Sequence, residues 1–246
     1  MESKNKIRPV PPFRRHSHRR IYRIVAVLLL LGGIATWLIV NPNSYSPTQD
    51  QTQSTTSEGS VLARDALEKL EVKGRAPKTG YQRTEFYDQW PTVDGCSLRQ
   101  KIIKREVGDS AVLDGCDVIA GEFDEPYTGK HLKFNQKSEF SKGIQIDHVV
   151  ALSDAWQKGA QYFDYDKRHT LATDPLNLLA VDSTANQQKS DGDAATWLPS
   201  NKAFRCQYVA RQISVKYKYG LWVTEAEHDA MSEILETCPN EPAIGV

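Results

Sequence analysis

The sequence lacks several motifs that would point directly to a common chemistry. Its 246 residues contain no glycine-rich phosphate-binding loop, no G-x-S-x-G motif of a serine hydrolase and no internal repeat. These absences leave little support for kinase, nucleotide-hydrolase or esterase activity. None of its four cysteines lies in a C-x-x-C pair, which argues against a zinc ribbon.

The chain also lacks a net charge, since its formal value is zero, but its charged residues are unevenly distributed along the sequence. The first 23 residues hold one acid, Glu2, and eight cations, so the rest of the chain carries about −7. An acidic remainder argues against broad electrostatic binding to polyanions. The eight cations are Lys4, Lys6, Arg8, Arg14, Arg15, Arg19, Arg20 and Arg23.

One hydrophobic run is long enough to matter for topology. Residues 24–40 contain no charged side chain, and as a helix they would span roughly 26 Å, close to the thickness of a bilayer's hydrocarbon core. The positive-inside rule then predicts a basic cytoplasmic tail at 1–23, a transmembrane signal anchor at 24–40 and an extracellular remainder of a single-pass cell-membrane protein. A cleaved signal peptide is the alternative and would make the protein secreted, but the sequence has no clear cleavage site.

The chain after residue 40 divides into two regions of different composition. Residues 41–60 are rich in Ser, Thr, Gln, Asn and Pro, which is typical of a flexible linker. Residues 61–246 have the composition of a folded extracytoplasmic domain and contain all the cysteines. An oxidising compartment permits two disulfides. Three pairings are open, and the sequence-local one is favoured because each pair closes a compact region: Cys96 with Cys116, and Cys206 with Cys238.

The stretch QIDHVVALSDAW places Asp147 directly beside His148 in an apolar, strand-like run. Neighbouring residues of a strand point to opposite faces, so the two could act together only where the strand ends or bends. A helical stretch follows, then a second strand at 177–182 that begins with Asn177, then a helix that starts near Ser183. The order is strand, helical insertion, strand, helix.

These residue types suit phosphodiester hydrolysis, which needs a base for water and a cation for the leaving oxygen. His148 is the candidate base, and the Asp147 carboxylate and the Asn186 amide oxygen suit a hard cation such as Mg²⁺. A single Asp-His pair is weak evidence, since core strands often contain a hydrogen-bonded histidine. The ordered set with Asn177 and Asn186 favours catalysis.

The same stretches, IDHVVALS and DPLNLLAVDSTANQQKSDGDAATWLP, resemble the HNH endonucleases in the branch where Asp replaces the first metal-binding His. From about residue 73 to 238 the chain is similar to secreted or membrane-anchored actinobacterial HNH proteins related to DUF1524. The resemblance implies an α+β fold with a ββα-metal core and additional helices.

The resemblance also implies the roles of four residues. His148 would be the general base, Asp147 and Asn186 would bind one divalent metal, Mg²⁺ or alternatively Mn²⁺, and Asn177 would orient the active-site hairpin. The expected function is metal-dependent endonuclease cleavage of DNA, with RNA as a second candidate substrate, leaving 5′-phosphate and 3′-hydroxyl ends.

Other residues carry weaker hypotheses. Lys189 and Arg168 are candidate phosphate contacts, with surface cations as the equal alternative, and His169 is the rival histidine. Beyond nucleic acid and the membrane, no protein partner can be inferred. The competing function is a catalytically inactive surface module that binds nucleic acid or a cell-envelope partner, which the acidic charge favours.

Overall fold

A computed structural model describes residues 61–245 of the chain. The predicted anchor at 24–40 and linker at 41–60 lie outside these residues. Within 61–245, no helix is both long and apolar enough to span a bilayer.

The described residues form a mixed α+β fold, as expected, with three small antiparallel sheets. The first pairs β1 with β2, the second runs in the order β3-β4-β5, and the third pairs β6 with β7. The strands are β1 (Thr92–Val93), β2 (Cys96–Ser97), β3 (Val112–Asp114), β4 (Asp117–Asp124), β5 (His131–Phe134), β6 (Ile144–His148) and β7 (Leu178–Asp182).

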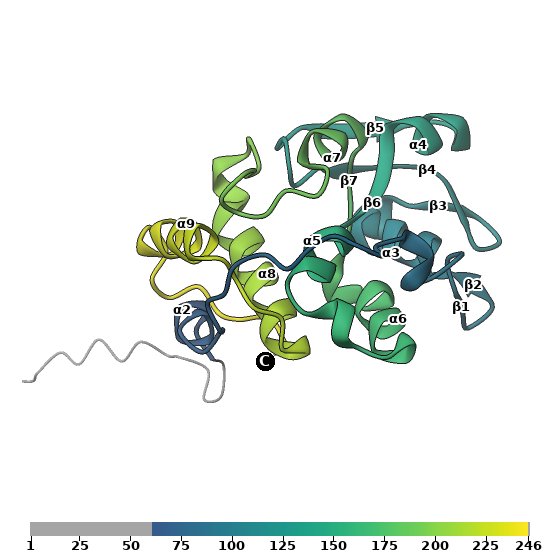
Figure 1. The fold of residues 1–246 in the computed structure, drawn as a ribbon. Helices are drawn as coiled ribbons and strands as arrows, with labels where there is room; N and C mark the ends of the chain where they lie inside the picture. Colours follow the sequence, from purple (N-terminus) through teal and green to yellow (C-terminus); the bar gives the residue numbers. More distant parts are fainter. Residues whose placement is uncertain (1–60, 246) are drawn as a thin grey trace, which may run out of the picture. The chain divides into compact units, whose positions relative to one another are not determined.

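Helices surround and connect these sheets (Figure 1). The α-helices are α2 (Ala63–Leu67), α3 (Leu98–Val107), α4 (Lys137–Gly143), α5 (Leu152–Gln157), α6 (Tyr165–Thr173), α7 (Ser183–Lys189), α8 (Arg205–Tyr219) and α9 (Glu225–Glu236). Short 3-10 turns include η1 (Arg83–Glu85) and η4 (Pro175–Asn177).

One part of the core is purely helical. In Figure 1, α2, α8 and α9 lie side by side, and they share a cluster of buried apolar side chains that includes Val209, Ile213 and Met231. α8 ends at Gly220, which adopts the left-handed conformation (φ 70°) that glycine tolerates best. α9 begins with a capping box formed by Thr224 and Glu227.

The second part of the core lies under the sheets. Ile102 and Ile103 of α3 are buried against Phe123 of β4 and against Leu178 and Ala180 of β7. This contact supports the β6-β7 pair, in which Ile144 faces the same cluster. The strand pair that carries the Asp-His motif is therefore held on a packed base.

Charged residues from α5, α8, α9 and the loop after α7 form a largely buried group, which we call the charge cluster. The Lys158 ammonium, with no exposed side-chain surface, lies 2.7 Å from Asp154 Oδ1, 2.8 Å from Asp193 Oδ2 and 2.6 Å from Glu227 Oε2. Buried charges are tolerated only when they are paired in this way. With two further cations the cluster balances three positive and three negative side chains: Arg75, Lys158, Lys216, Asp154, Asp193 and Glu227.

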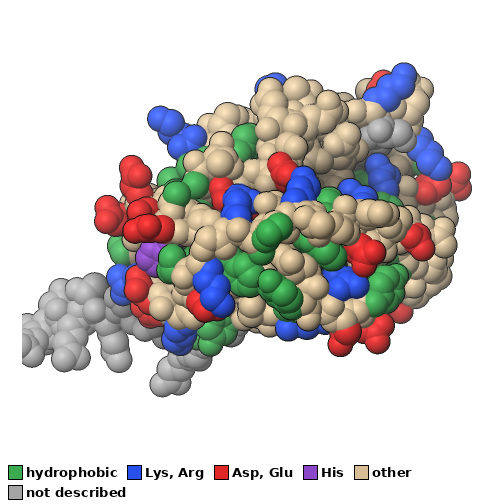
Figure 2. Space-filling model, in the orientation of Figure 1, with side chains coloured by type: hydrophobic (Ala, Val, Ile, Leu, Met, Phe, Trp, Pro, Cys, Tyr) green, Lys and Arg blue, Asp and Glu red, His purple; other side chains and the backbone are tan. Residues whose placement is uncertain are grey.

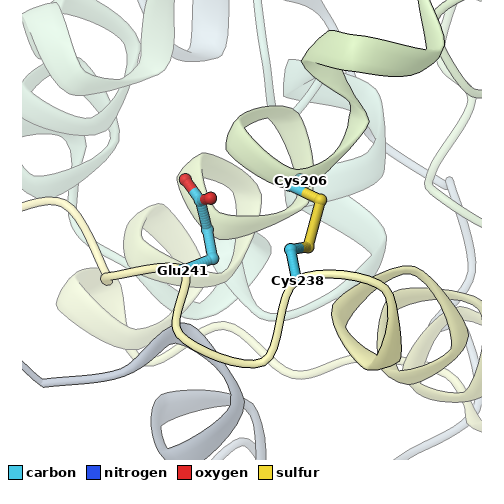
Figure 3. A group of neighbouring side chains, drawn as sticks. All are labelled: Cys206, Cys238 and Glu241. Atoms are coloured by element: carbon cyan, nitrogen blue, oxygen red, sulfur yellow. A yellow bond between two sulfur atoms is a disulfide. The ribbon is translucent and has the colours of Figure 1, made fainter. Parts of the chain in front are cut away.

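Two disulfides tie the fold, and they have the sequence-local pairing. Cys96–Cys116 joins β2 to the turn before β4, and Cys206–Cys238 joins the start of α8 to the turn after α9 (Figure 3). Glu241 lies near the second disulfide, and the three groups have the proximity of a metal site. Because the two sulfurs are bonded to each other, they are not thiolates, and this group is not a zinc site.

The ends of the described residues also meet. The Ala63 amide donates to the Glu241 carbonyl (2.9 Å), and the Ala243 amide donates to the Val61 carbonyl (2.8 Å). The C-terminus lies beside α2 in Figure 1. Figure 2 shows Lys and Arg side chains interspersed with Asp and Glu over one face, with acidic side chains gathered over α9.

Candidate active site

The Asp-His motif lies at the last two positions of β6, where the strand ends. Asp147 is opposite Leu179 and His148 is opposite Leu178 in the antiparallel register. Asp147 and His148 line one cavity of about 330 Å³, together with Asn186 from α7. Both residues line this cavity, although neighbouring residues of a strand point to opposite faces.

The hydrogen bonds of His148 define its protonation. Its Nε2 lies 2.9 Å from the Ala172 carbonyl, and because a carbonyl can only accept, Nε2 carries the proton and Nδ1 keeps the lone pair. Burial, followed by the charge of Arg83, lowers the pKa of His148 to about 3. The ring therefore stays neutral at physiological pH, with Nδ1 available as a base.

Two aromatic rings hold the imidazole in place. The Trp90 ring is stacked on His148 at a centroid distance of 5.9 Å and an interplanar angle of 7°, and the Tyr87 ring lies 5.8 Å away. With the Ala172 bond at one edge, the ring has little freedom to rotate. A base held in one orientation loses less entropy when the reaction begins.

Asn177 lies in η4 directly before β7, whereas we predicted it as the first residue of that strand. It is fully buried, and its Oδ1 accepts from the Val150 amide (2.8 Å) while its Nδ2 donates to the carbonyls of Val150 and Leu171 (3.3 Å each). Its own carbonyl accepts from the Val149 amide (2.8 Å). Asn177 thus binds the backbone that follows His148.

Asp147 is 4% exposed and has protein partners on both oxygens. The Tyr127 hydroxyl donates to Oδ2, and the Lys189 ammonium lies 3.0 Å from Oδ1 and 2.9 Å from the His148 carbonyl. Burial raises the pKa of Asp147 above its ordinary value, while Lys189 opposes that shift. Lys189 therefore contacts the candidate metal ligand from inside the protein, rather than presenting its charge on an open surface.

The donor set fits a hard divalent cation. Asn186 Nδ2 donates to Gln145 Oε1 (2.9 Å), which leaves the Asn186 amide oxygen as the atom that can bind a metal. A carboxylate offers about four lone-pair sites, so Asp147 retains acceptor capacity beside Lys189 and Tyr127. Both oxygens belong to side chains lining the same cavity, and oxygen ligands are those that Mg²⁺ and Mn²⁺ prefer.

Two predicted residues lie elsewhere. Arg168 is bound by the Glu85 carbonyl (2.8 Å) and carboxylate (3.2 Å), and its guanidinium lies 5.7 Å from the Trp156 ring centre. It is not among the residues lining the cavity. His169 lies on α6 with its ring 6.0 Å from that of Tyr165, and it too is absent from the lining.

The sequence did not connect several side chains of the cavity with the Asp-His motif. Lys78, Tyr81 and Arg83 line it from the segment before β1, and Asp191 lines it from the loop after α7. The basic residues near Lys78 were noticeable in the sequence, but nothing in their spacing connected them with a motif about 70 residues later. Gln145, two residues before Asp147, was visible only as part of the strand.

A two-stranded antiparallel pair ending in Asp-His, followed by a helix bearing Asn, defines an HNH-like class of nuclease domain. The model of the family "GmrSD restriction endonucleases, C-terminal domain" matches residues 100–234. The chain therefore belongs to this family of HNH-like, DUF1524 domains.

A curated relative matches the chain over a longer stretch. The chain is 35% identical over 180 residues to an "Uncharacterized secreted protein" of Arthroderma benhamiae, a match that covers 72% of this chain and 84% of the relative. No solved structure shows a significant match to the chain. The disulfides and the name of this relative agree with a location outside the cytoplasm.

Proposed function

We propose that the chain is a metal-dependent endonuclease that hydrolyses phosphodiester bonds in DNA, with RNA as a second substrate, and that β6, β7 and α7 form a ββα-metal core. The observation that carries the proposal is His148, whose Nε2 is bonded and whose Nδ1 keeps its lone pair, in the wall of the cavity that Asp147 and Asn186 also line. Membership of a restriction endonuclease family supports the same activity.

In the proposed reaction, His148 Nδ1 takes a proton from a water molecule. The resulting hydroxide attacks phosphorus, the bond to the 3′ oxygen breaks, and the departing oxygen takes a proton from a water molecule, leaving a 5′-phosphate and a 3′-hydroxyl. Asn177 keeps His148 in position through the backbone at Val149 and Val150. Trp90 and Tyr87 restrict rotation of the imidazole ring.

Asp147 and the Asn186 amide oxygen would hold the divalent ion. When bound, that ion supplies stabilisation of the negative charge that develops on the leaving oxygen. Lys189 holds Asp147 on the cavity wall, and its positive charge favours the ionised carboxylate. Gln145 holds the Asn186 amide so that its nitrogen, rather than its oxygen, faces the protein partner.

The second candidate function is an inactive surface module that binds nucleic acid or an envelope partner. One observation favours it: both oxygens of Asp147 already have partners within the protein, Tyr127 and Lys189. In such a module, these contacts would be the permanent state of the carboxylate. The two functions differ in a simple respect, because only the enzyme has a turnover that depends on His148.

The deciding experiment uses the full-length protein with intact disulfides, supercoiled plasmid, and Mg²⁺ or Mn²⁺. The expected result is nicking that EDTA abolishes and that His148→Ala reduces by about 10²-fold or more, since a general base contributes on that scale. His169→Ala is the matched control, because it removes a histidine outside the cavity, and it should keep the wild-type rate.

Circular dichroism of both variants shows whether they are folded. If folded His148→Ala nicks plasmid as fast as wild type, then His148 is not the base. If folded wild type cleaves neither DNA nor RNA with either metal, the inactive module replaces the enzyme as the function.

We also propose that the domain is extracellular and tethered to the cell membrane by residues 24–40. The two disulfides and the secreted relative support the outer location. Protease added to intact cells should degrade residues 61–246 if the tether keeps them outside. Protection from protease would reverse the orientation, and recovery of the domain from the medium would indicate cleavage of the N-terminal segment.

A further inference from the structure

One wall of the cavity comes from a segment that lies before the region matching the family model. Residues 100–234 match that model, whereas Lys78, Tyr81 and Arg83 lie upstream of it and line the cavity with Asp147 and His148. η1 carries Arg83, and Phe86 and Tyr87, which follow η1, are buried in the core beside Trp156. This anchoring brings Arg83 to the catalytic cavity.

Arg83 differs from the other cations near the cavity in having no acidic partner. Lys78 lies 2.9 Å from Asp191, and Arg75 lies 2.9 Å from Asp154 within the charge cluster. Within residues 61–245, Arg83 forms no ion pair with a carboxylate, and its side chain is exposed to solvent. Its guanidinium donates to the Tyr87 hydroxyl and lies 5.1 Å from the Tyr87 ring centre.

The chemistry of this side chain suits an anion. A guanidinium has five N–H donors in a flat fork that matches two oxygens of a phosphate. The bond to Tyr87 uses one nitrogen and holds the fork in place, which leaves donors for a ligand. Because the chain outside its first 23 residues is acidic, a polyanion needs a local unpaired cation at the point where it enters the cavity.

We propose that Arg83 binds a backbone phosphate of the nucleic-acid strand in the cavity, beside the phosphodiester that His148 addresses. The proposal rests on the proposed nuclease function and assigns its phosphate-binding group to a segment outside the matched family region. Arg83 is therefore a substrate contact, and Tyr87 is the positioning residue that orients it.

The test measures binding without turnover. A short fluorescein-labelled DNA duplex is titrated with full-length protein in EDTA, and anisotropy is recorded at several salt concentrations. Arg83→Gln should weaken binding about tenfold or more, as loss of a charged hydrogen bond does, and should reduce the salt dependence of log K by about one phosphate contact. Arg83→Lys should recover part of the loss, because charge returns without the fork.

Two further variants separate phosphate binding from a structural role. Tyr87→Phe removes the hydroxyl that Arg83 contacts but keeps the cation, so binding and its salt dependence should change less than in Arg83→Gln. Arg64→Gln makes the same chemical change on α2, where the side chain is 53% exposed and does not line the cavity. It should bind DNA like wild type.

The outcomes distinguish this proposal from the proposed function. If wild type nicks plasmid and Arg83→Gln binds DNA with wild-type affinity and salt dependence, the Arg83 assignment is wrong and the nuclease stands. If Tyr87→Phe reproduces the full loss seen in Arg83→Gln, Arg83 acts only on local structure. If wild type binds DNA but never cleaves it, the nuclease fails while the phosphate contact stands. If wild type neither binds nor cleaves, both are overturned.

Discussion

Asn177 shows how a single buried side chain can organise a site that it does not enter. Its amide satisfies three backbone groups, at Leu171 and at both the amide and the carbonyl of Val150. We predict that Asn177→Ala lowers the free energy of unfolding by about 1–3 kcal/mol, because it leaves buried polar groups without partners. Urea unfolding measures this change, and plasmid nicking should slow as His148 loses its fixed backbone.

Asn135→Ala is the control, because Asn135 is exposed on the turn after β5. A surface truncation of this kind changes the free energy of unfolding by about 0.5 kcal/mol or less. If the two variants have equal stability, the hydrogen bonds of Asn177 contribute nothing to the fold.

The residues of the motif itself were predictable, but their partners were not. Asp147 and His148 are neighbours in the chain, but the sequence did not show that the strand ends at His148, before α5 begins at Leu152. The groups that define their chemistry come from elsewhere: Ala172 binds His148, and Tyr127 binds Asp147. These contacts depend on how separate segments fold together, which no local spacing expresses.

At the scale of the element, the sequence predicts which segments form helices better than it predicts the residue at which each helix begins. We expected Ser183 to cap α7, but the cap is Asp182, which accepts from the Ala185 amide (2.8 Å). Ser183 donates instead to the Lys142 carbonyl. The Ser200 hydroxyl also bonds to a distant residue, donating to the Tyr127 carbonyl before α8 begins at Arg205. Both hydroxyls therefore form hydrogen bonds with residues far away in the sequence instead of capping a helix.

The disulfide between α8 and the turn after α9 leads to a prediction about the stability of the fold. Cys206 and Cys238 are 32 residues apart, so replacing both with Ser should lower the free energy of unfolding by about 3–4 kcal/mol through the entropy of the open chain. Because neither cysteine lines the cavity, the folded variant should keep its nicking rate. Urea unfolding and a plasmid assay below the transition measure the two effects.

The other disulfide, between β2 and the turn before β4, is the comparison. Cys96 and Cys116 are 20 residues apart, and the same replacement should cost slightly less. If the double variant at Cys206 and Cys238 is as stable as wild type, this disulfide does not reduce the conformational entropy of the unfolded chain. Loss of nicking in the folded variant would mean that this disulfide affects the geometry of the cavity, although neither cysteine lines it.

At the scale of the whole molecule, the charge cluster connects segments far apart in the chain and makes stability depend on pH. Burial alone would raise the pKa of Asp193, but the hydrogen bond and charge of Lys158, with the charge of Arg75, lower it to about 2. The ordinary value is 3.8, so the unfolded chain binds more protons than the native protein between these pH values. The contribution of Asp193 to the free energy of unfolding should therefore be constant above this range and should be lost as pH decreases from about 4 to about 2.

Urea unfolding at a series of pH values tests this dependence. Asp193→Asn should be less stable than wild type at pH 7 and should lose part of the slope between about pH 4 and pH 2, because the titrating group is gone. Asp114→Asn, at an exposed position on β3, should keep the wild-type slope. Equal slopes in all three proteins would exclude Asp193 as a source of acid sensitivity.

The pairing of Val61 with Ala243 and of Ala63 with Glu241 makes the described chain almost a closed ring. A short linker could join residue 245 to residue 61 with little loss of loop entropy. New ends could then be opened in an exposed turn such as the one at Gly115. Because of the same pairing, a tag fused to the C-terminus would emerge beside residue 61, where the described chain begins.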